Sequence, residues 1–201
     1  MGLLYSALEN HEKGISLLTN KEKGFLLRLA RQSLEAAVSV DRMEEPDVVI
    51  GPLRERRGAF VSLHWGGRLR GCVGFARPVK ALYKTVIEAA AAAALKDTRF
   101  DPVRPEEISG MVVEISALFS CQQISPEDIQ VGVHGLVVSL ERAYGVLLPQ
   151  VAVSANWSPQ QFLEETCHKA GLSRDAWQHG TTIEAFTAEV FSESSLPAND
   201  L

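Results

Sequence analysis

The sequence contains few cysteines, no long apolar run and no recognisable targeting segment. Its 3 cysteines among 201 residues are odd in number and widely spaced, which argues against a disulfide framework and favours a reducing compartment. No stretch reaches 18 apolar residues, and the first residues lack the charged and apolar regions of a secretory signal. We therefore expect a cytoplasmic protein that does not cross a membrane.

Motifs for metals and nucleotides are also missing. No histidines or cysteines stand at C-x₂-C, H-x₃-H or H-E-x-x-H spacing. The glycines form neither a P-loop nor a dinucleotide fingerprint. We therefore predict no metal site and no cofactor.

The composition that remains is that of a folded globule. Hydrophobic residues make up 46% and charged residues 22% of the chain, and its length suits one domain of ordinary size. Periodicity, capping residues and turn signals predict an α+β fold, an antiparallel or mixed sheet with flanking helices. The predicted helices cover 19–40, 78–95 and 158–171, and the predicted strands cover 59–64, 68–75, 110–119, 136–140, 145–148 and 183–191. We expect one domain over 19–191, an N-terminal arm over 1–18 and a disordered tail over 192–201.

Charge is distributed unevenly along the chain. The net charge at pH 7 is −5, yet residues 48–87 carry eight basic side chains and one acid, a local charge of +7. A concentrated basic stretch in an acidic protein favours local binding of an anion over general binding of nucleic acid. Within it, we interpret the three arginines of residues 54–57 as a solvated loop. Arg68 and Arg70 lie in a predicted strand and are candidate ligand-binding residues.

That strand has the unusual sequence R-L-R-G-C-V-G-F over 68–75. Glycines weaken a strand, so Gly71 and Gly74 indicate a bulge, a bend or the close approach of a backbone or ligand. A helix should open at Pro78, and its six alanines over 89–94 would let a neighbouring element pack closely. A glycine-bearing strand end beside a helix N-terminus would form a cradle for an anion.

Cys72 lies between these glycines and has two interpretations. A thiol near arginines can be a catalytic nucleophile, and a free cysteine can instead fill a small buried space. In a plain two-residue hairpin Cys72 pairs with Val61, and His64 then points to the opposite face of the sheet. This argues against a His64–Cys72 dyad, and a bulge at Gly71 would reverse the conclusion.

Two further polar residues are candidates for the same ligand site. Glu114 lies in the middle of a predicted strand, where a carboxylate normally faces solvent. On a covered face it would need a cationic partner, which Arg68 or Arg70 would supply. Gln150 follows a predicted strand and is a candidate polar residue beside a cleft.

The hexapeptide L-R-G-C-V-G at 69–74 resembles the hallmark of the AMMECR domain family, named after the Alport syndrome, midface hypoplasia and elliptocytosis chromosomal region. The resemblance covers roughly residues 20–191. The other matching segments are R-G-A-F-V-S-L at 57–63, D-T-R-F at 97–100, E-I-S at 114–116, L-P-Q-V at 148–151, and residues 162–172. The chain departs from the family pattern at Phe75, where relatives often carry a small polar residue.

The resemblance implies an α+β fold with a larger and a smaller subdomain, and a hexapeptide near a cleft. The chain is also similar to the prokaryotic branch of the family called AmmeMemoRadiSam system protein A. This similarity implies a Memo-like protein and a radical SAM enzyme as partners. The resemblance implies no catalytic mechanism for this chain.

Two hypotheses on function follow from the residues. In the first, the chain is an enzyme or enzyme component whose cleft, lined by Arg70, Cys72 and Glu114, binds an anionic small molecule. In the second, it is a non-catalytic adaptor whose hexapeptide shapes a surface for a partner protein. Nucleic-acid binding ranks last, because no aromatic stacking platform accompanies the basic residues.

Overall fold

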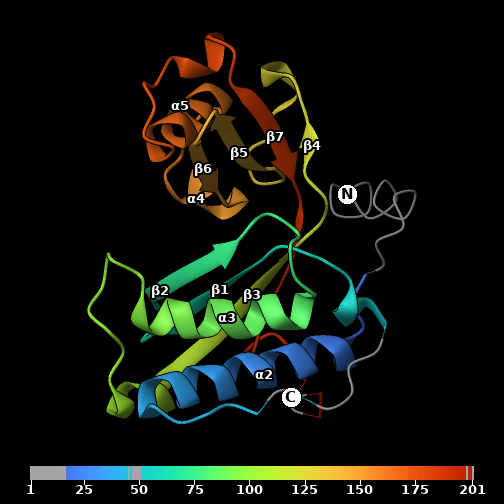
Figure 1. Ribbon diagram of the computed structural model, residues 1–201, viewed down its shortest axis with the longest axis vertical. Helices are drawn as coiled ribbons and strands as arrows, with labels where there is room; N and C mark the ends of the chain where they lie inside the picture. The colour runs from blue at the N-terminus through green and yellow to red at the C-terminus, as the bar shows by residue number, and fades with distance from the viewer. Residues whose placement is uncertain (1–16, 45, 47–50, 198, 201) are drawn as a thin grey trace. The chain divides into compact units, whose positions relative to one another are not determined.

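The protein folds as two compact units with separate sheets and separate cores (Figure 1). The structure, a computed structural model, describes residues 17–44, 46, 51–197 and 199–200. Residues 119–188 form what we call the inserted unit. The described residues before 119 and after 188 form the main unit. All but the last two residues of the arm predicted over 1–18 lie outside the described residues.

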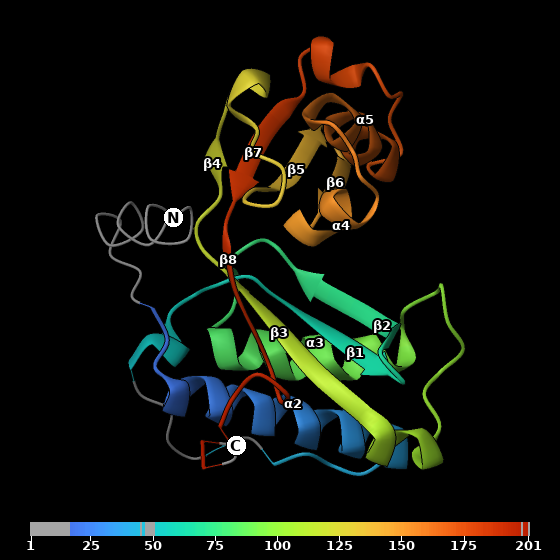
Figure 2. The same ribbon diagram turned by 180° about the vertical axis from the view of Figure 1, so that it is seen from behind.

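The main unit is a four-stranded sheet with two helices packed against one face (Figure 2). The strand order is β2-β1-β3-β8, so β2 is an edge strand. The strands are β1 (Ala59–Trp65), β2 (Arg68–Phe75), β3 (Met111–Leu118) and β8 (Ala188–Ser192). The helices are α2 (Asn20–Ser39) and α3 (Leu82–Leu95), with short 3₁₀ turns η1 (Gly51–Arg54) and η2 (Pro105–Gly110).

The helix α2 begins at the capping box that the sequence predicts. The Thr19 hydroxyl accepts a hydrogen bond from the Glu22 N–H at 3.3 Å, and the Glu22 carboxylate accepts from the Thr19 N–H at 2.7 Å. The helix ends at Val40, whose left-handed φ of 60° stops further helical hydrogen bonding. The leucines of α2 join the core against α3 and the sheet.

The helix α3 begins later than the sequence predicts, at Leu82 instead of Pro78. The residues in between are held in an extended bridge: the Arg57 N–H donates to the Lys80 carbonyl at 3.3 Å, and the Leu82 N–H donates to the Glu55 carbonyl at 2.8 Å. The first N–H of α3 therefore has a partner within the protein. The N-terminus of this helix does not follow the hexapeptide directly.

The alanine run of α3 lets a neighbouring element pack closely, as the sequence predicts, and the structure shows that this element is β2. A Cβ atom added at Gly71 would lie 2.3 Å from the backbone oxygen of Ala93. No side chain fits at that distance, so the glycine is required by helix–sheet packing.

The inserted unit is a second four-stranded sheet, of order β4-β7-β5-β6, packed against two helices. Its strands are β4 (Gln122–Gln123), β5 (Gly135–Leu140), β6 (Ala143–Leu147) and β7 (Thr182–Phe186). Its helices are α4 (Pro149–Ser154) and α5 (Pro159–Lys169), with 3₁₀ turns η3 (Pro126–Asp128) and η4 (Ala176–Gln178). Ser158 and Gln161 form a capping box at α5, as the N-cap serine predicts.

The end of the chain differs from the sequence prediction in two ways. The strand predicted over 183–191 is split into β7 and β8, which belong to different sheets. The tail predicted to be disordered from residue 192 begins with specific contacts. The Glu193 carboxylate accepts from Arg31 Nε at 2.9 Å and from the Val113 N–H at 2.8 Å. Among the described residues, no helix is long and apolar enough to cross a membrane.

Candidate functional site

A bulge in β2 decides which face of the sheet carries the Cys72 thiol. The β1–β2 register shifts by one residue within the hairpin, so that β2 contributes an extra residue, Arg70. Cys72 therefore pairs with Ser62, and the pairing with Val61 predicted from a plain hairpin is wrong. Cys72 shares a face with Ser62 and His64, because alternate residues of a strand point the same way. The sequence-based objection to a His64–Cys72 pair does not hold.

This face of the main unit, which we call the thiol face, is opposite the face that packs on α2 and α3. Partners across β2, β1 and β3 form its rows, and residues facing each other across strands share a face. The three rows are Leu69, His64 and Val112; Cys72, Ser62 and Glu114; and Gly74, Phe60 and Ser116. The middle row thus places a thiol, a hydroxyl and a carboxylate side by side across three strands.

The polar side chains of the thiol face contact one another. The Ser62 hydroxyl donates to Cys72 Sγ at 3.4 Å, and the Cys72 side chain is half-buried. His64 Nε2 lies 3.8 Å from Glu114 Oε1, with both side chains partly exposed. The neighbour of Glu114 is therefore the His64 imidazole, where the sequence had suggested an arginine.

Arg70 does not join the thiol face, because the bulge aims its side chain at the loop that follows α3. Its guanidinium binds Glu107 in a bidentate manner, with Nε–Oε1 at 2.9 Å and Nη2–Oε2 at 3.1 Å. Nη1 also donates to the Asp101 carbonyl at 2.8 Å. The Glu107 carboxylate is 5% exposed, and its hydrogen bonds with Arg70 lower its pKa. Arg70 thus anchors this loop to β2.

The other predicted ligand-binding residues are dispersed. Arg68 is exposed at the end of the hairpin, opposite Trp65. Gly71 contacts α3, and Gly74 lies under the Phe60 ring, where a Cβ would come within 2.4 Å of ring atoms. Both glycines are therefore explained by packing. Gln150 lies in α4 of the inserted unit, so the main unit brings together only part of the predicted set, Cys72, Gly74 and Glu114.

The C-terminal end of α3, and not the N-terminal end, lies beside the hexapeptide. Two residues after Leu95, the Asp97 carboxylate accepts from the Cys72 N–H at 2.8 Å. Arg99 Nη2 donates to the Cys72 carbonyl at 3.3 Å and pairs with Asp97 Oδ2 at 2.7 Å. The anion cradle predicted at a helix N-terminus is therefore absent from the described part of this segment.

Asp97 and Arg99 are both charged in this arrangement. The hydrogen bonds from Arg99 lower the pKa of Asp97 to about 2, although burial of the carboxylate opposes that shift. The same hydrogen bonds raise the pKa of Arg99, and the nearby Cys72 sulfur contributes to this increase. The Asp97 side chain is 6% exposed and that of Arg99 is 56% exposed.

The basic stretch does not gather into one patch, and one of its arginines is in the core. Arg57 is 1% exposed, so the prediction that it belongs to a solvated loop is wrong. Its Nε donates to the Leu118 carbonyl at 3.0 Å and its Nη2 to the Ala117 carbonyl at 3.4 Å. Burial lowers its pKa. Arg57 therefore satisfies carbonyl groups at the end of β3.

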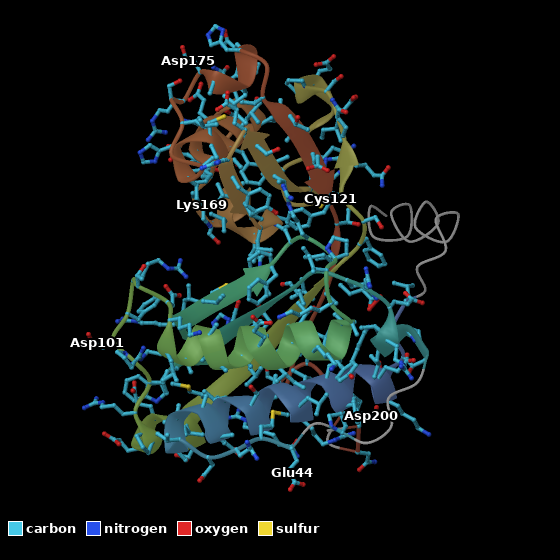
Figure 3. The ribbon with its side chains drawn as sticks, in the orientation of Figure 1. Glu44, Asp101, Cys121, Lys169, Asp175 and Asp200 are labelled. Carbon is cyan, nitrogen blue, oxygen red and sulfur yellow. The ribbon has the colours of Figure 1, made fainter. Side chains whose placement is uncertain are left out.

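A pocket of about 490 Å³ adjoins the Cys72 backbone through Arg99. It is lined by Arg70, Thr98, Arg99, Phe100, Asp101, Arg104 and Glu107. Asp101, labelled in Figure 3, lies on the loop that Arg70 anchors. Three arginines and two acids give this lining a net positive charge, and Glu107 is already paired with Arg70.

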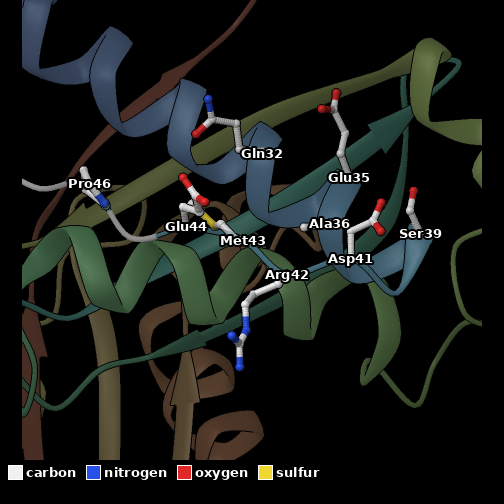
Figure 4. A pocket seen from close by; sticks show the side chains of 9 residues that line it. All are labelled: Gln32, Glu35, Ala36, Ser39, Asp41, Arg42, Met43, Glu44 and Pro46. Atoms are coloured by element: carbon white, nitrogen blue, oxygen red, sulfur yellow. The ribbon is translucent and has the colours of Figure 1, made fainter.

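A second pocket, of about 710 Å³, lies at the C-terminal end of α2 (Figure 4). Its lining is predominantly acidic and includes Glu35, Asp41 and Glu44 but none of the predicted site residues. Among the described residues, no three His, Cys, Asp or Glu side chains are grouped so that they could hold a metal ion.

The remaining cysteines belong to the inserted unit. Cys167 lies in α5 and is fully buried in the core, and this burial raises the pKa of its thiol. Cys121, labelled in Figure 3, is half-buried. The residues that sequence reasoning missed are instead in the main unit: Ser62 as the partner of Cys72, and Asp97 with Arg99. The D-T-R-F match at 97–100 was the signal for the last two.

Comparison with known proteins agrees with this fold. The AMMECR1 family model matches residues 27–191. A protein of Methanosarcina barkeri is 38% identical over 88% of this chain and 93% of its own, and one of Pyrococcus furiosus is 43% identical over 84% and 87%. The crystal structure of an uncharacterized protein from Pyrococcus horikoshii superimposes with a TM-score of 0.80 at 39% identity, covering 86% of this chain and 93% of that one. The chain belongs to the AMMECR1 family.

Proposed function

We propose that the chain is an enzyme, or a component of one, that binds an anionic small molecule at the thiol face and uses Cys72 as its nucleophile. The observation that carries this proposal is the bulge at Arg70. It turns the thiol to the side of the sheet that carries the His64 imidazole and the Glu114 carboxylate.

These three groups have complementary chemical roles. His64 and Cys72 lie in adjacent rows of the thiol face, on the neighbouring strands β1 and β2. The imidazole can take the proton of the thiol while the sulfur adds to a carbonyl carbon of the substrate, and the electron pair of the C=O π bond moves onto the carbonyl oxygen. Glu114, 3.8 Å from the imidazole, stabilises the imidazolium that results.

The preference for an anion comes from Arg99 and the pocket that it lines. Its guanidinium is more than half exposed, and Nη1, which does not bind Asp97, can donate to an oxygen of a carboxylate or phosphate group. Arg104 adds a second exposed guanidinium to the same lining. An acidic group of the substrate would bind here while its electrophilic carbon reaches Cys72.

The proposal is tested by alkylating the intact protein with iodoacetate, which is anionic, and with iodoacetamide, which is neutral. Both reagents transfer a carbon to the thiolate and release iodide, and peptide mass spectrometry gives the rate at each cysteine. Cys121 serves as an internal reference because it is also half-buried. We expect the rate ratio of iodoacetate to iodoacetamide at Cys72 to exceed that at Cys121 by about threefold, the effect of one exposed cation.

Two variants separate the parts of the proposal. His64→Gln should slow the alkylation of Cys72 by both reagents about tenfold near neutral pH, since the base is lost. Arg104→Gln should reduce only the preference for iodoacetate. If Cys72 in the wild type reacts no faster than Cys121 with either reagent, the thiol is not activated, and the adaptor hypothesis is favoured.

A further inference from the structure

The Cys72 peptide unit is held from outside the sheet by two side chains. Because β2 is an edge strand, the N–H and C=O of Cys72 that point away from β1 have no neighbouring strand. The Asp97 carboxylate accepts the N–H at 2.8 Å, and Arg99 donates to the carbonyl at 3.3 Å. Both contacts occur at the one residue of the hexapeptide that carries a nucleophilic side chain.

Asp97 also fixes the position of Arg99. The guanidinium donates Nε to Oδ1 at 2.9 Å and Nη2 to Oδ2 at 2.7 Å, and Asp97 Oδ1 accepts the Arg99 N–H at 3.2 Å. The guanidinium lies 5.5 Å from the centroid of the Phe100 ring, a cation–π distance. These contacts keep the Arg99 side chain, which is more than half exposed, beside Cys72.

The charge of Arg99 opposes an unfavourable feature of this location. Cys72 lies near the C-terminal end of α3, where the last carbonyls carry a partial negative charge that disfavours a thiolate. Asp97 adds a full negative charge, and Glu114 on β3 lies in the same row as Cys72, with Ser62 between them. Arg99 supplies a positive charge beside Cys72, while Arg70 is directed to Glu107.

We propose that Asp97 and Arg99 are positioning residues for the Cys72 thiol: Asp97 holds Arg99 against the Cys72 peptide unit, and Arg99 stabilises the thiolate form. This inference rests on the proposed function, because it concerns the same nucleophile. It assigns to the D-T-R segment a role in reactivity in addition to its role in folding. The Ser62 hydroxyl, which donates to the Cys72 sulfur, also stabilises the thiolate form.

The test is the pH dependence of Cys72 alkylation by iodoacetamide, a neutral reagent whose approach does not depend on Arg99. In Arg99→Gln the midpoint of the rate curve should rise by about half a pH unit or more, because a cation near the thiolate is removed. In Arg99→Lys, which keeps the charge but lacks the fork, the midpoint should lie between those of the wild type and Arg99→Gln. Arg42→Gln, the same charge change at an exposed site elsewhere in the main unit, should leave the midpoint unchanged.

The outcomes distinguish this inference from the proposed function. If Cys72 is activated in the wild type but its midpoint is the same in Arg99→Gln, Arg99 has only a structural role, and this inference alone is overturned. If Arg42→Gln shifts the midpoint as much as Arg99→Gln, the effect is one of general charge, and the inference is again overturned. If Cys72 is no more reactive than Cys121 in the wild type, both proposals are wrong. The Cys121 rate in each sample shows that the reagent is equivalent.

Discussion

Replacing Asp97 with asparagine should destabilise the main unit by about 1–2 kcal/mol near neutral pH. The pKa of this carboxyl falls from its ordinary 3.8 to about 2 in the folded protein. At 1.36 kcal/mol for each pKa unit, that shift corresponds to about 2.4 kcal/mol. The expected loss of about 1–2 kcal/mol is smaller than this because solvent screens the interaction: the partner guanidinium of Arg99 is 56% exposed. The asparagine oxygen can still accept the Cys72 N–H, so the substitution chiefly removes the charge.

The sign of the pH dependence follows from the lowered pKa of Asp97. A carboxylate that ionises more readily when folded contributes its stability fully above the unfolded pKa of 3.8, and loses it as the pH falls through about 2. The difference in unfolding free energy between the wild type and Asp97→Asn should therefore be constant from neutral pH to about pH 4. It should fall to about half near pH 3 and almost vanish below pH 2.

Urea unfolding followed by the fluorescence of Trp65 measures this difference in the main unit. The other two tryptophans, Trp157 and Trp177, lie in the inserted unit and are replaced with phenylalanine in every variant compared. Asp101→Asn, a change of an exposed carboxyl on the nearby loop, is the control and should change the free energy by less than about 0.5 kcal/mol. Equal stability of Asp97→Asn and wild type at neutral pH would refute the reasoning, as would a difference that persists at pH 2.

Three further predictions concern packing, the loop anchor and the buried thiol. Gly71→Ala should lower the unfolding free energy of the main unit by about 1–3 kcal/mol in the same urea assay, because its Cβ would meet the Ala93 oxygen. Glu107→Gln should cost about 3 kcal/mol by leaving Arg70 without its anion; this loss should shrink in acid, as the low pKa of Glu107 requires. Cys167 should react with iodoacetamide only when urea unfolds the inserted unit, as mass spectrometry would show.

Local sequence signals were sufficient to predict most elements of the fold. The capping boxes at Thr19 and Ser158 mark the starts of α2 and α5, and the Gly66-Gly67 pair closes the β1–β2 hairpin with positive φ at both residues. The close contact between the alanine run and Gly71 also follows from residue size. The capping boxes and the hairpin turn depend on neighbours a few residues apart, which is why a single sequence predicts them.

The candidate site depends on contacts between distant residues, and these could not be predicted in the same way. The bulge coincides with the pairing of Arg70 and Glu107, which are 37 residues apart, and Cys72 meets Asp97 across 25 residues. One extra residue in β2 reverses the faces of all that precede it in the strand, so a plain hairpin gave the wrong partner for Cys72. The late start of α3 depends likewise on the segment around Arg57, whose N–H holds Lys80.

The outer margin of β2 has a consequence for solubility. An open strand margin can recruit a strand from another molecule and so begin aggregation. At Cys72 the amide and carbonyl that such a strand would use are already occupied by a carboxylate and a guanidinium. The side chains of Asp97 and Arg99 thus make the hydrogen bonds that a neighbouring strand would make at Cys72. Replacing both residues would leave this strand margin open to self-association of the protein.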